Sequence, residues 1–391
     1  MGIMLRNFLI PCILCLISYS GFSQTDSSHL RVSLLTCSPG DELYTTFGHS
    51  ALRITDSLHN DDIVYNYGTF NFDEPGFYTK FIRGKLMYYL STEDFTSFKH
   101  DYEADKRTMT EQVLNLSFTE KEKIFSLLMQ NLQSENRFYK YDFLFDNCTT
   151  RLRDLLENAA DTTVQYANIL KEKTRFRQLI HAYLDKGDKQ WGKLGIDLLL
   201  GAKTDAVMDN REAMFLPDYL LKGVDSARIG VKHVVRSKYD LMFYGEENGT
   251  KNFFTDPVFI FSVLFIGIVV ISFSKNTRLR GILNRFDGFL FFMTGFTGIV
   301  IFFMWFGTDH ITTKNNYNLL WAWPTHAVAA FFVDSKKAWT KYYFTFTVVA
   351  NLLVLMLWFF VPQQLNPAFI PIVLLIIFRS TSYARQPVHT I

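Results

Sequence analysis

Two short segments contain residue types suited to thiol chemistry. The first, FGHSALRI over residues 47–54, places His49 directly after a glycine and at the start of an alternating segment typical of a strand. The second, FDNCTT over residues 145–150, places Cys148 where a loop enters a predicted helix. A cysteine and a histidine form the minimal unit of thiol nucleophilic catalysis when their side chains meet.

The position of Cys148 favours an ionised thiol. Unpaired backbone N–H groups and the positive end of the helix dipole lie at a helix start, and both stabilise a thiolate and lower its pKa. Asn147 and Thr149 are suited to cap that helix. Asn66, on a predicted strand that could lie beside the His49 strand, is a candidate to orient the ring of His49; a satisfied polar residue at a strand end is the alternative interpretation.

Structural interpretations of the same residues remain open. Cys37 and Cys148 both follow the predicted export signal, and two cysteines in an oxidising compartment most often form one disulfide, which would remove the thiolate. A buried small side chain is a second interpretation of Cys148. His49 taken alone is as consistent with a structural hydrogen bond as with a catalytic base. We expect Cys37 to be structural.

The helices and strands that must position these residues predict an α+β fold. Ser117 and Glu120 form a capping box that opens a helix to about residue 133, and a second helix begins near Cys148. Residues 160–225 look helical and irregular, and they either pack the core or line a substrate channel. The strands are predicted at residues 29–36, 49–55, 62–67, 84–90 and 109–116.

The N-terminus reads as an export signal over residues 1–23. Arg6 provides the positive region, an apolar stretch follows over residues 8–17, and Gly21 and Ser23 are the small residues before a cleavage site. An uncleaved anchor is the alternative. In either case residues 24–252 are expected to form an exported domain.

The C-terminal third reads as a bundle of five membrane-spanning helices over residues 253–380, followed by a cytoplasmic tail over residues 381–391. A spanning helix needs about 20 mainly apolar residues, and the third stretch is partly polar while the fifth is short. The five stretches are residues 254–274, 286–306, 317–334, 341–361 and 367–379.

Alternate loops of this bundle are basic. Lys and Arg gather in residues 275–285, in residues 335–341 and in the tail, whereas the intervening loops 307–316 and 362–366 hold only Lys314. This is the positive-inside pattern, and it places the 24–252 domain outside the cytoplasm, in agreement with the export signal.

One outer loop is unusually polar. Asp309 and His310 begin a run of hydrogen-bonding residues that leads to Trp321, Trp323 and, at membrane depth, His326. A solvated loop with an aromatic interface belt is one interpretation. The other is a polar site at the membrane surface, because ionisable groups inside a membrane are costly.

Several function classes receive no support. The net charge is +2, which gives no case for nucleic-acid binding. No zinc-type spacing of His or Cys is present after the signal, His29 and His59 stand among scattered histidines, and no nucleotide-binding glycine motif occurs. We therefore expect neither a metal nor a cofactor.

The order of the two motifs, histidine about 100 residues before cysteine, resembles circularly permuted NlpC-type papain-like proteins. The lecithin-retinol acyltransferase group carries a related helix-start Asn-Cys pair. Together with the five predicted spans, the arrangement resembles the Lnb family, membrane proteins with a periplasmic domain that are implicated as lipoprotein N-acyltransferases. The resemblance covers nearly the whole mature chain.

This resemblance implies that Cys148 is the nucleophile and His49 the general base, in a permuted papain-like domain at the bacterial inner membrane. It implies a phospholipid acyl donor and a lipoprotein acceptor, with Asp309 and His310 as candidate contributors from the bundle. A papain-like cell-wall peptidase or amidase and a non-catalytic envelope scaffold are the alternatives.

Overall fold

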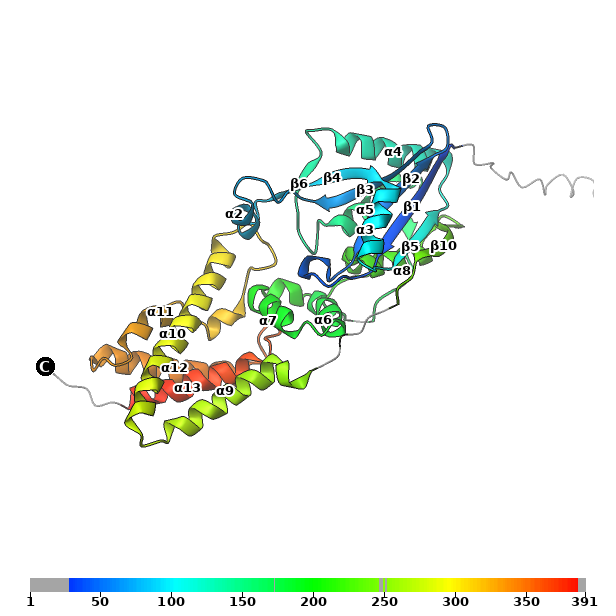
Figure 1. Ribbon diagram of the computed structural model, residues 1–391. Helices are drawn as coiled ribbons and strands as arrows, with labels where there is room; N and C mark the ends of the chain where they lie inside the picture. The colour runs from blue at the N-terminus through cyan, green and yellow to red at the C-terminus, as the bar shows by residue number, and fades with distance from the viewer. Residues whose placement is uncertain (1–27, 172, 246–248, 250–251, 386–391) are drawn as a thin grey trace, which may run out of the picture.

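The computed structural model of the protein describes residues 28–171, 173–245, 249 and 252–385. The predicted signal, residues 1–23, lies outside the described residues. Figure 1 shows a sheet domain built from the first part of the chain and a group of long helices built from the last third. The α+β character predicted for the exported part is confirmed.

A seven-stranded sheet in the order β10-β5-β1-β2-β3-β4-β6 forms the frame of the exported domain, and every neighbouring pair is antiparallel. β7 (Val164–Gln165), β8 (Arg228–Ile229) and β9 (Lys232–His233) form a separate small sheet. The strands of the large sheet are β1 (Leu30–Cys37), β2 (His49–Asp56), β3 (Asp61–Thr69), β4 (Met87–Asp94), β5 (Met109–Leu114), β6 (Phe138–Lys140) and β10 (Val235–Met242).

Both faces of the sheet are covered by helices. α4 (Phe118–Leu132), α5 (Cys148–Ala159) and α8 (Pro217–Ser226) cover one face, where Leu34 and Leu52 are buried. α3 (Phe95–Ala104) covers the other face, where Leu35 and Phe98 are buried. Leu34 and Leu35 point to opposite faces because side chains alternate along a strand.

The predicted strands are confirmed to within a few residues, with one shift. β4 begins at Met87 rather than at residue 84, because Gly84 adopts a positive φ of 65° in the turn that follows α2 (Phe77–Ile82). The capping box is confirmed: Ser117 Oγ accepts from the Glu120 N–H and the Glu120 carboxylate accepts from the Ser117 N–H. The sequence patterns missed α2, α3 and β10.

Part of residues 160–225 packs around a second core, with Phe176, Leu184 and Phe215 at its centre. Inside this region the Arg177 guanidinium is fully buried and bonds to the carboxylates of Asp197 and Asp205. The helical elements here are α6 (Phe176–Lys186), α7 (Gln190–Leu199), η2 (Ala202–Asp205) and η3 (Glu212–Phe215).

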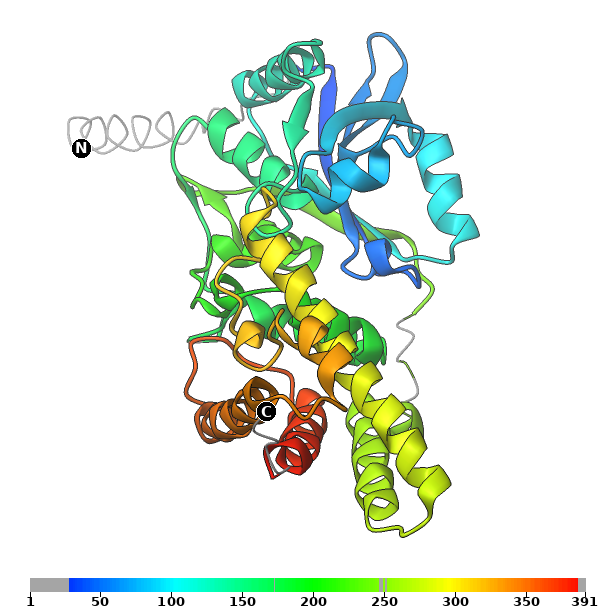
Figure 2. The same ribbon diagram turned by 90° about the vertical axis from the view of Figure 1, so that its left-hand side faces the viewer.

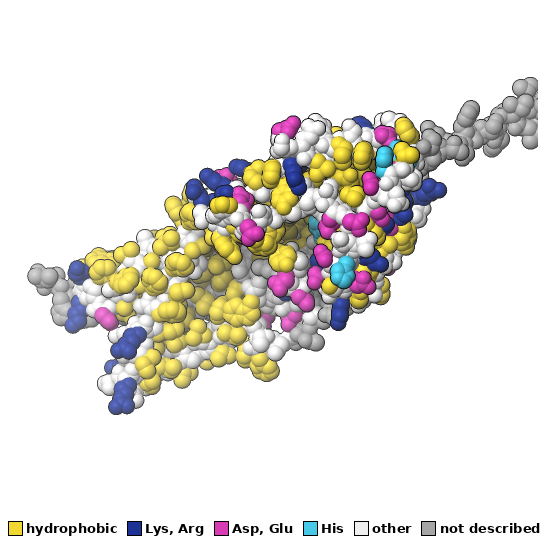
Figure 3. Space-filling model, turned by 45° about the horizontal axis from the view of Figure 1, so that its top comes forward, with side chains coloured by type: hydrophobic (Ala, Val, Ile, Leu, Met, Phe, Trp, Pro, Cys, Tyr) yellow, Lys and Arg dark blue, Asp and Glu magenta, His cyan; other side chains and the backbone are white. Residues whose placement is uncertain are grey.

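The C-terminal third is helical. Among the described residues, two helices are long and apolar enough to cross a membrane, α10 (Thr277–Phe306) and α12 (Ala338–Leu357). α9 (Pro257–Ser272) and α13 (Phe369–Ala384) are apolar but shorter. Figure 3 shows hydrophobic side chains over much of the visible bundle and Lys and Arg at its far end.

The predicted span 317–334 is not one continuous helix. It divides into η5 (Tyr317–Leu320), α11 (His326–Ala329) and η6 (Ala330–Phe332), all of which contact α10. Pro324 lies in the break, and proline lacks the N–H that a continuous helix needs there. The prediction of a single helix here is therefore wrong.

A buried polar junction joins the two parts of the chain. Asp197 in α7 accepts from the Asn366 amide at 2.9 Å, and its backbone carbonyl accepts from Asn318. Gln363 donates to the Leu200 carbonyl, and Leu194 joins the hydrophobic core of the bundle. Figure 2 shows α10, in yellow, rising from the bundle to the exported domain. Residues 160–225 thus dock the exported domain onto the bundle.

Asp197→Ala should loosen this junction. Removing one member of a buried ion pair typically costs about 3–5 kcal/mol, and we expect the lower end, about 3 kcal/mol, because Asp205 still pairs with Arg177. Thermal unfolding in detergent measures the loss. The exposed pair of Arg211 and Glu157 provides the control. Arg211→Ala should lower the free energy of unfolding by less than about 1 kcal/mol. Equal losses for the two variants would contradict the account of the junction.

Candidate active site

Cys148 is the first residue of α5, and Asn147 fixes that helix start. The Asn147 Oδ1 accepts from the backbone N–H groups of Thr149 and Thr150, each at 2.9 Å. Its Nδ2 donates to the carbonyls of Phe143 and Phe215, each at 2.8 Å. Asn147 therefore holds the helix that carries the thiol, which is a positioning role.

His49 is the first residue of β2. Gly48 before it has a φ of 79°, and a Cβ there would lie 2.7 Å from the Cys37 carbonyl oxygen, so the close approach of β1 requires glycine. The His49 Nε2 lies 3.1 Å from Oδ1 of Asn66 in β3. The structure thus places Asn66 against the ring of His49, where the sequence left its role open.

Glu93 in β4 is a further polar partner behind His49 and Asn66, and the sequence patterns did not predict it. The Asn66 Nδ2 donates to the Glu93 Oε1 at 2.7 Å. Because a carboxylate accepts, this bond fixes which end of the Asn66 amide faces His49. The His49 Nε2 must then donate to the Asn66 Oδ1, which leaves Nδ1 as the ring nitrogen for the thiol.

His49 and Cys148, about 100 residues apart in sequence, lie close enough for each to shift the pKa of the other. Burial disfavours the thiolate, but the charge and hydrogen bond of His49, with a bond from the Ser50 N–H, outweigh it. The pKa of Cys148 therefore falls from 9.0 to about 7. Burial also lowers the pKa of His49, but the charge and hydrogen bond of Cys148 and the bond to Asn66 produce a net rise.

These opposite shifts favour a thiolate–imidazolium pair. A thiolate is the nucleophilic form of cysteine, and an adjacent imidazole can move protons to and from reacting groups. The arrangement is therefore competent for covalent thiol catalysis of acyl transfer.

Cys37 is not part of this arrangement. It is fully buried in β1, and both Cys37 and Cys148 are free thiols, so the structure contains no disulfide between them. Burial raises the pKa of Cys37 to about 12, which keeps it protonated and inert.

A cavity of about 1080 Å³ contains the thiol and the imidazole, slightly above the usual range of small-molecule sites, about 300–1,000 Å³. Much of its wall is aromatic, and one side is formed by residues 309–312 of the bundle's outer loop. Its apolar lining includes Phe47, Phe70, Phe81, Leu86, Tyr88, Phe143, Phe145 and Phe215.

Asp309 and His310 line this cavity and hold its rim together. The Asp309 carboxylate pairs with Lys140 at 2.9 Å, and its N–H donates to the Arg83 carbonyl. The His310 Nε2 donates to the Phe81 carbonyl at 3.0 Å. Both residues thus connect the outer loop to the exported domain. In the part of the chain that the structure describes, neither forms a hydrogen bond or ion pair with Cys148 or His49.

His326 is buried in the bundle and does not line the cavity. Its Nδ1 accepts from the Tyr343 hydroxyl at 2.7 Å, and its ring stacks on Trp323. These contacts provide a packing role for the histidine that the sequence placed at membrane depth.

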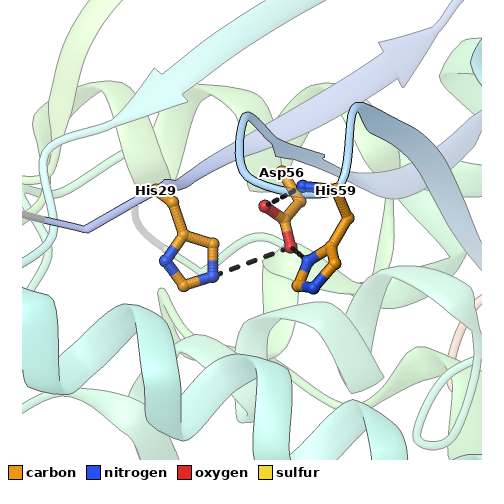
Figure 4. Close-up of side chains that lie close together, drawn as sticks. All are labelled: His29, Asp56 and His59. Carbon is orange, nitrogen blue, oxygen red and sulfur yellow. Dashed lines mark hydrogen bonds and ion pairs between the residues drawn. The ribbon is translucent and has the colours of Figure 1, made fainter.

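His29 and His59, which looked scattered in the sequence, meet at Asp56 (Figure 4). The candidate ligand atoms of the three residues lie within 4.8 Å of one another, a spacing that could hold a metal ion. The Asp56 carboxylate already accepts from the N–H groups of Leu58 and His59 and from the His59 ring, so it stabilises the turn after β2. None of the three lines the cavity.

The rate at which Cys148 reacts with iodoacetamide should rise with pH through a midpoint near 7. In His49→Ala the stabilising charge is lost, and the midpoint should move to at least the ordinary value of 9.0. The thiolate fraction at pH 7, and with it the rate, should fall about 50-fold or more. Cys37→Ser, as control, should leave the profile unchanged. A midpoint near 9 in the native protein would contradict the ion pair.

Comparison with known families gives two matches. Residues 20–182 match the model described as the Lnb N-terminal periplasmic domain, and residues 248–389 match the model described as the Lnb transmembrane domain. No curated protein and no solved structure matches the chain. With a periplasmic domain and a transmembrane domain of the same family in the same order, the chain belongs to the Lnb family.

Proposed function

We propose that this protein is a cysteine-dependent acyltransferase of lipoprotein maturation. It moves an acyl chain from a membrane phospholipid, through a thioester on Cys148, to the N-terminal amine of a diacylglyceryl-cysteine lipoprotein. Membership of the Lnb family indicates lipoprotein processing. The observation that carries the proposal is the position of Cys148 and His49 in a cavity walled partly by the membrane bundle.

In the first half-reaction the Cys148 thiolate attacks the ester carbonyl of the phospholipid. A carbon–sulfur bond forms, the carbon–oxygen ester bond breaks, and the leaving lysophospholipid oxygen takes the proton from the His49 Nδ1. Asn147 already occupies the N–H groups of Thr149 and Thr150, so the N–H of Cys148 is the donor at this helix start that faces the oxyanion.

In the second half-reaction the lipoprotein amine attacks the thioester. A carbon–nitrogen amide bond forms, the carbon–sulfur bond breaks, and the amine proton goes to the His49 Nδ1, which regenerates the ion pair. Asn66 keeps the ring oriented in both steps through its bond to Nε2. The ester of the donor stores the energy of the amide, so the chemistry needs neither a metal nor a nucleotide.

The set of cysteine, histidine and asparagine is the arrangement found in papain-like enzymes, which supports a permuted papain-like architecture for the exported domain. We also propose five crossings of the inner membrane: α9, α10, the broken segment 317–334, α12 and α13. The Asn284 amide near the start of α10 donates to Asp334 just before α12, whereas the loop after α10 contacts the exported domain. The segment between α10 and α12 therefore returns across the bundle, in agreement with the basic loops.

A cell-wall peptidase would use the same thiol chemistry. The aromatic wall and the contribution of residues 309–312 favour a lipid substrate instead, because a soluble glycopeptide has no need of a wall supplied by the membrane bundle. A scaffold would have no use for a thiol whose pKa is lowered to about 7.

Membranes that contain the protein should convert a diacylated lipoprotein to its triacylated form, detected by mass spectrometry. Cys148→Ala should abolish conversion, since Cys37, the other free thiol among the described residues, is buried and stays protonated. Asn66→Ala should slow conversion about tenfold or more through loss of ring orientation. Cys37→Ser is the matched control and should retain the native rate.

Conversion by Cys148→Ala at the native rate would reject the mechanism. Release of muropeptides from peptidoglycan by the full chain, without lipoprotein conversion, would instead identify the peptidase. Full function of Cys148→Ala in cells would identify the scaffold.

A further inference from the structure

α2 and the turn after it form an exposed apolar and basic surface that the catalytic mechanism does not use. Tyr78 is 75 % exposed, and Phe81 and Ile82 are each 49 % exposed. Arg83 and Lys85 follow directly and are also exposed. We call residues 77–85 the α2 surface.

The α2 surface rests on the loop that follows α10. The Arg83 carbonyl accepts from the Asp309 N–H, and the Phe81 carbonyl accepts from the His310 ring. At Gly84 a Cβ would lie 3.1 Å from the His310 nitrogen, so glycine allows the close approach of the two backbones. Figure 1 shows α2 between the sheet and the upper end of α10.

Positive charge exceeds negative charge around this contact. Lys140, Arg83 and Lys85 all act on the Asp309 carboxylate, and together they lower its pKa. Three cations thus share one carboxylate, while Lys80 is separately paired with Glu74. This leaves an excess of positive charge around Asp309, at the part of the Cys148 cavity that Phe81, Gly84 and Lys140 help to line.

We propose that the α2 surface binds the phosphate-bearing headgroup layer of the membrane. In this arrangement Tyr78, Phe81 and Ile82 lie at the boundary between headgroups and acyl chains, and Arg83 and Lys85 bind the phosphate of the donor phospholipid beside the cavity mouth.

The position of the surface selects a lipid layer over a protein partner. The apolar exterior of α10 continues up to Phe306, which is 62 % exposed, one turn before the loop that contacts α2. Aromatic side chains concentrate at the membrane–water boundary, and basic side chains nearby bind lipid phosphates. Figure 3 shows Lys and Arg gathered between the exported domain and the hydrophobic bundle.

The role in donor binding rests on the proposed acyl transfer, but the contact with the membrane does not. Spin labels test the contact directly. In a Cys37→Ser/Cys148→Ser background reconstituted into phospholipid vesicles, a label at Ile82→Cys should be more accessible to oxygen than to a polar nickel reagent. A label at Leu58→Cys, 70 % exposed on the turn after β2, is the aqueous control.

Acylation of Cys148 tests the headgroup contact. Arg83→Gln/Lys85→Gln should lower the rate of acylation by phospholipid about tenfold or more, and added salt should reduce that difference. The same variant should react with the soluble ester 4-nitrophenyl butyrate at the native rate. Lys123→Gln/Arg236→Gln removes the same charge from exposed positions elsewhere on the domain and should leave both rates unchanged.

Each outcome decides the proposal. A label at position 82 as accessible to the nickel reagent as the label at position 58 would overturn it, as would native phospholipid acylation by Arg83→Gln/Lys85→Gln. A label at position 82 that loses its accessibility to the nickel reagent only after a lipoprotein is added would identify a protein partner. That result would also overturn the proposal. If no ester acylates Cys148, the proposed function fails, and the spin labels still decide the membrane contact.

Discussion

We propose that the rest of the site depends on one interaction, the ion pair between the Cys148 thiolate and the His49 imidazolium. Burial alone would raise the pKa of the thiol, as it does for Cys37, so the charge of His49 has to outweigh it. That requirement explains why Asn66 and Glu93 lie behind the ring on the next two strands. They hold one tautomer and one orientation, and the antiparallel register of β2, β3 and β4 places them there.

A second constraint is that the cavity needs both parts of the chain. Residues 309–312 complete its wall only because the exported domain is docked on the bundle. The junction around Asp197, Asn318 and Asn366 is buried and hydrogen-bonded. Such a junction favours one fixed orientation of the exported domain on the bundle over a flexible connection. The membrane bundle therefore contributes to the site itself, beyond its function as an anchor.

The sequence predicted the elements that depend on local patterns. Alternation marked β2, the capping box at Ser117 marked α4, and Asn147 marked the start of α5. It could not find Glu93, because a carboxylate near a strand end has no pattern that distinguishes a partner of Asn66 from a solvated residue. It also missed the break in 317–334, where composition looked like a span but Pro324 interrupts the helix, and β10, whose side chains are mostly exposed.

The most direct measurement is the intact mass of the full-length protein after incubation with phospholipid in the absence of a lipoprotein acceptor. The account predicts one added acyl chain on Cys148, released by neutral hydroxylamine as a thioester is, and lost when a diacylated lipoprotein is supplied. Native protein that remains unmodified, or an acyl chain found on any other residue, would contradict it.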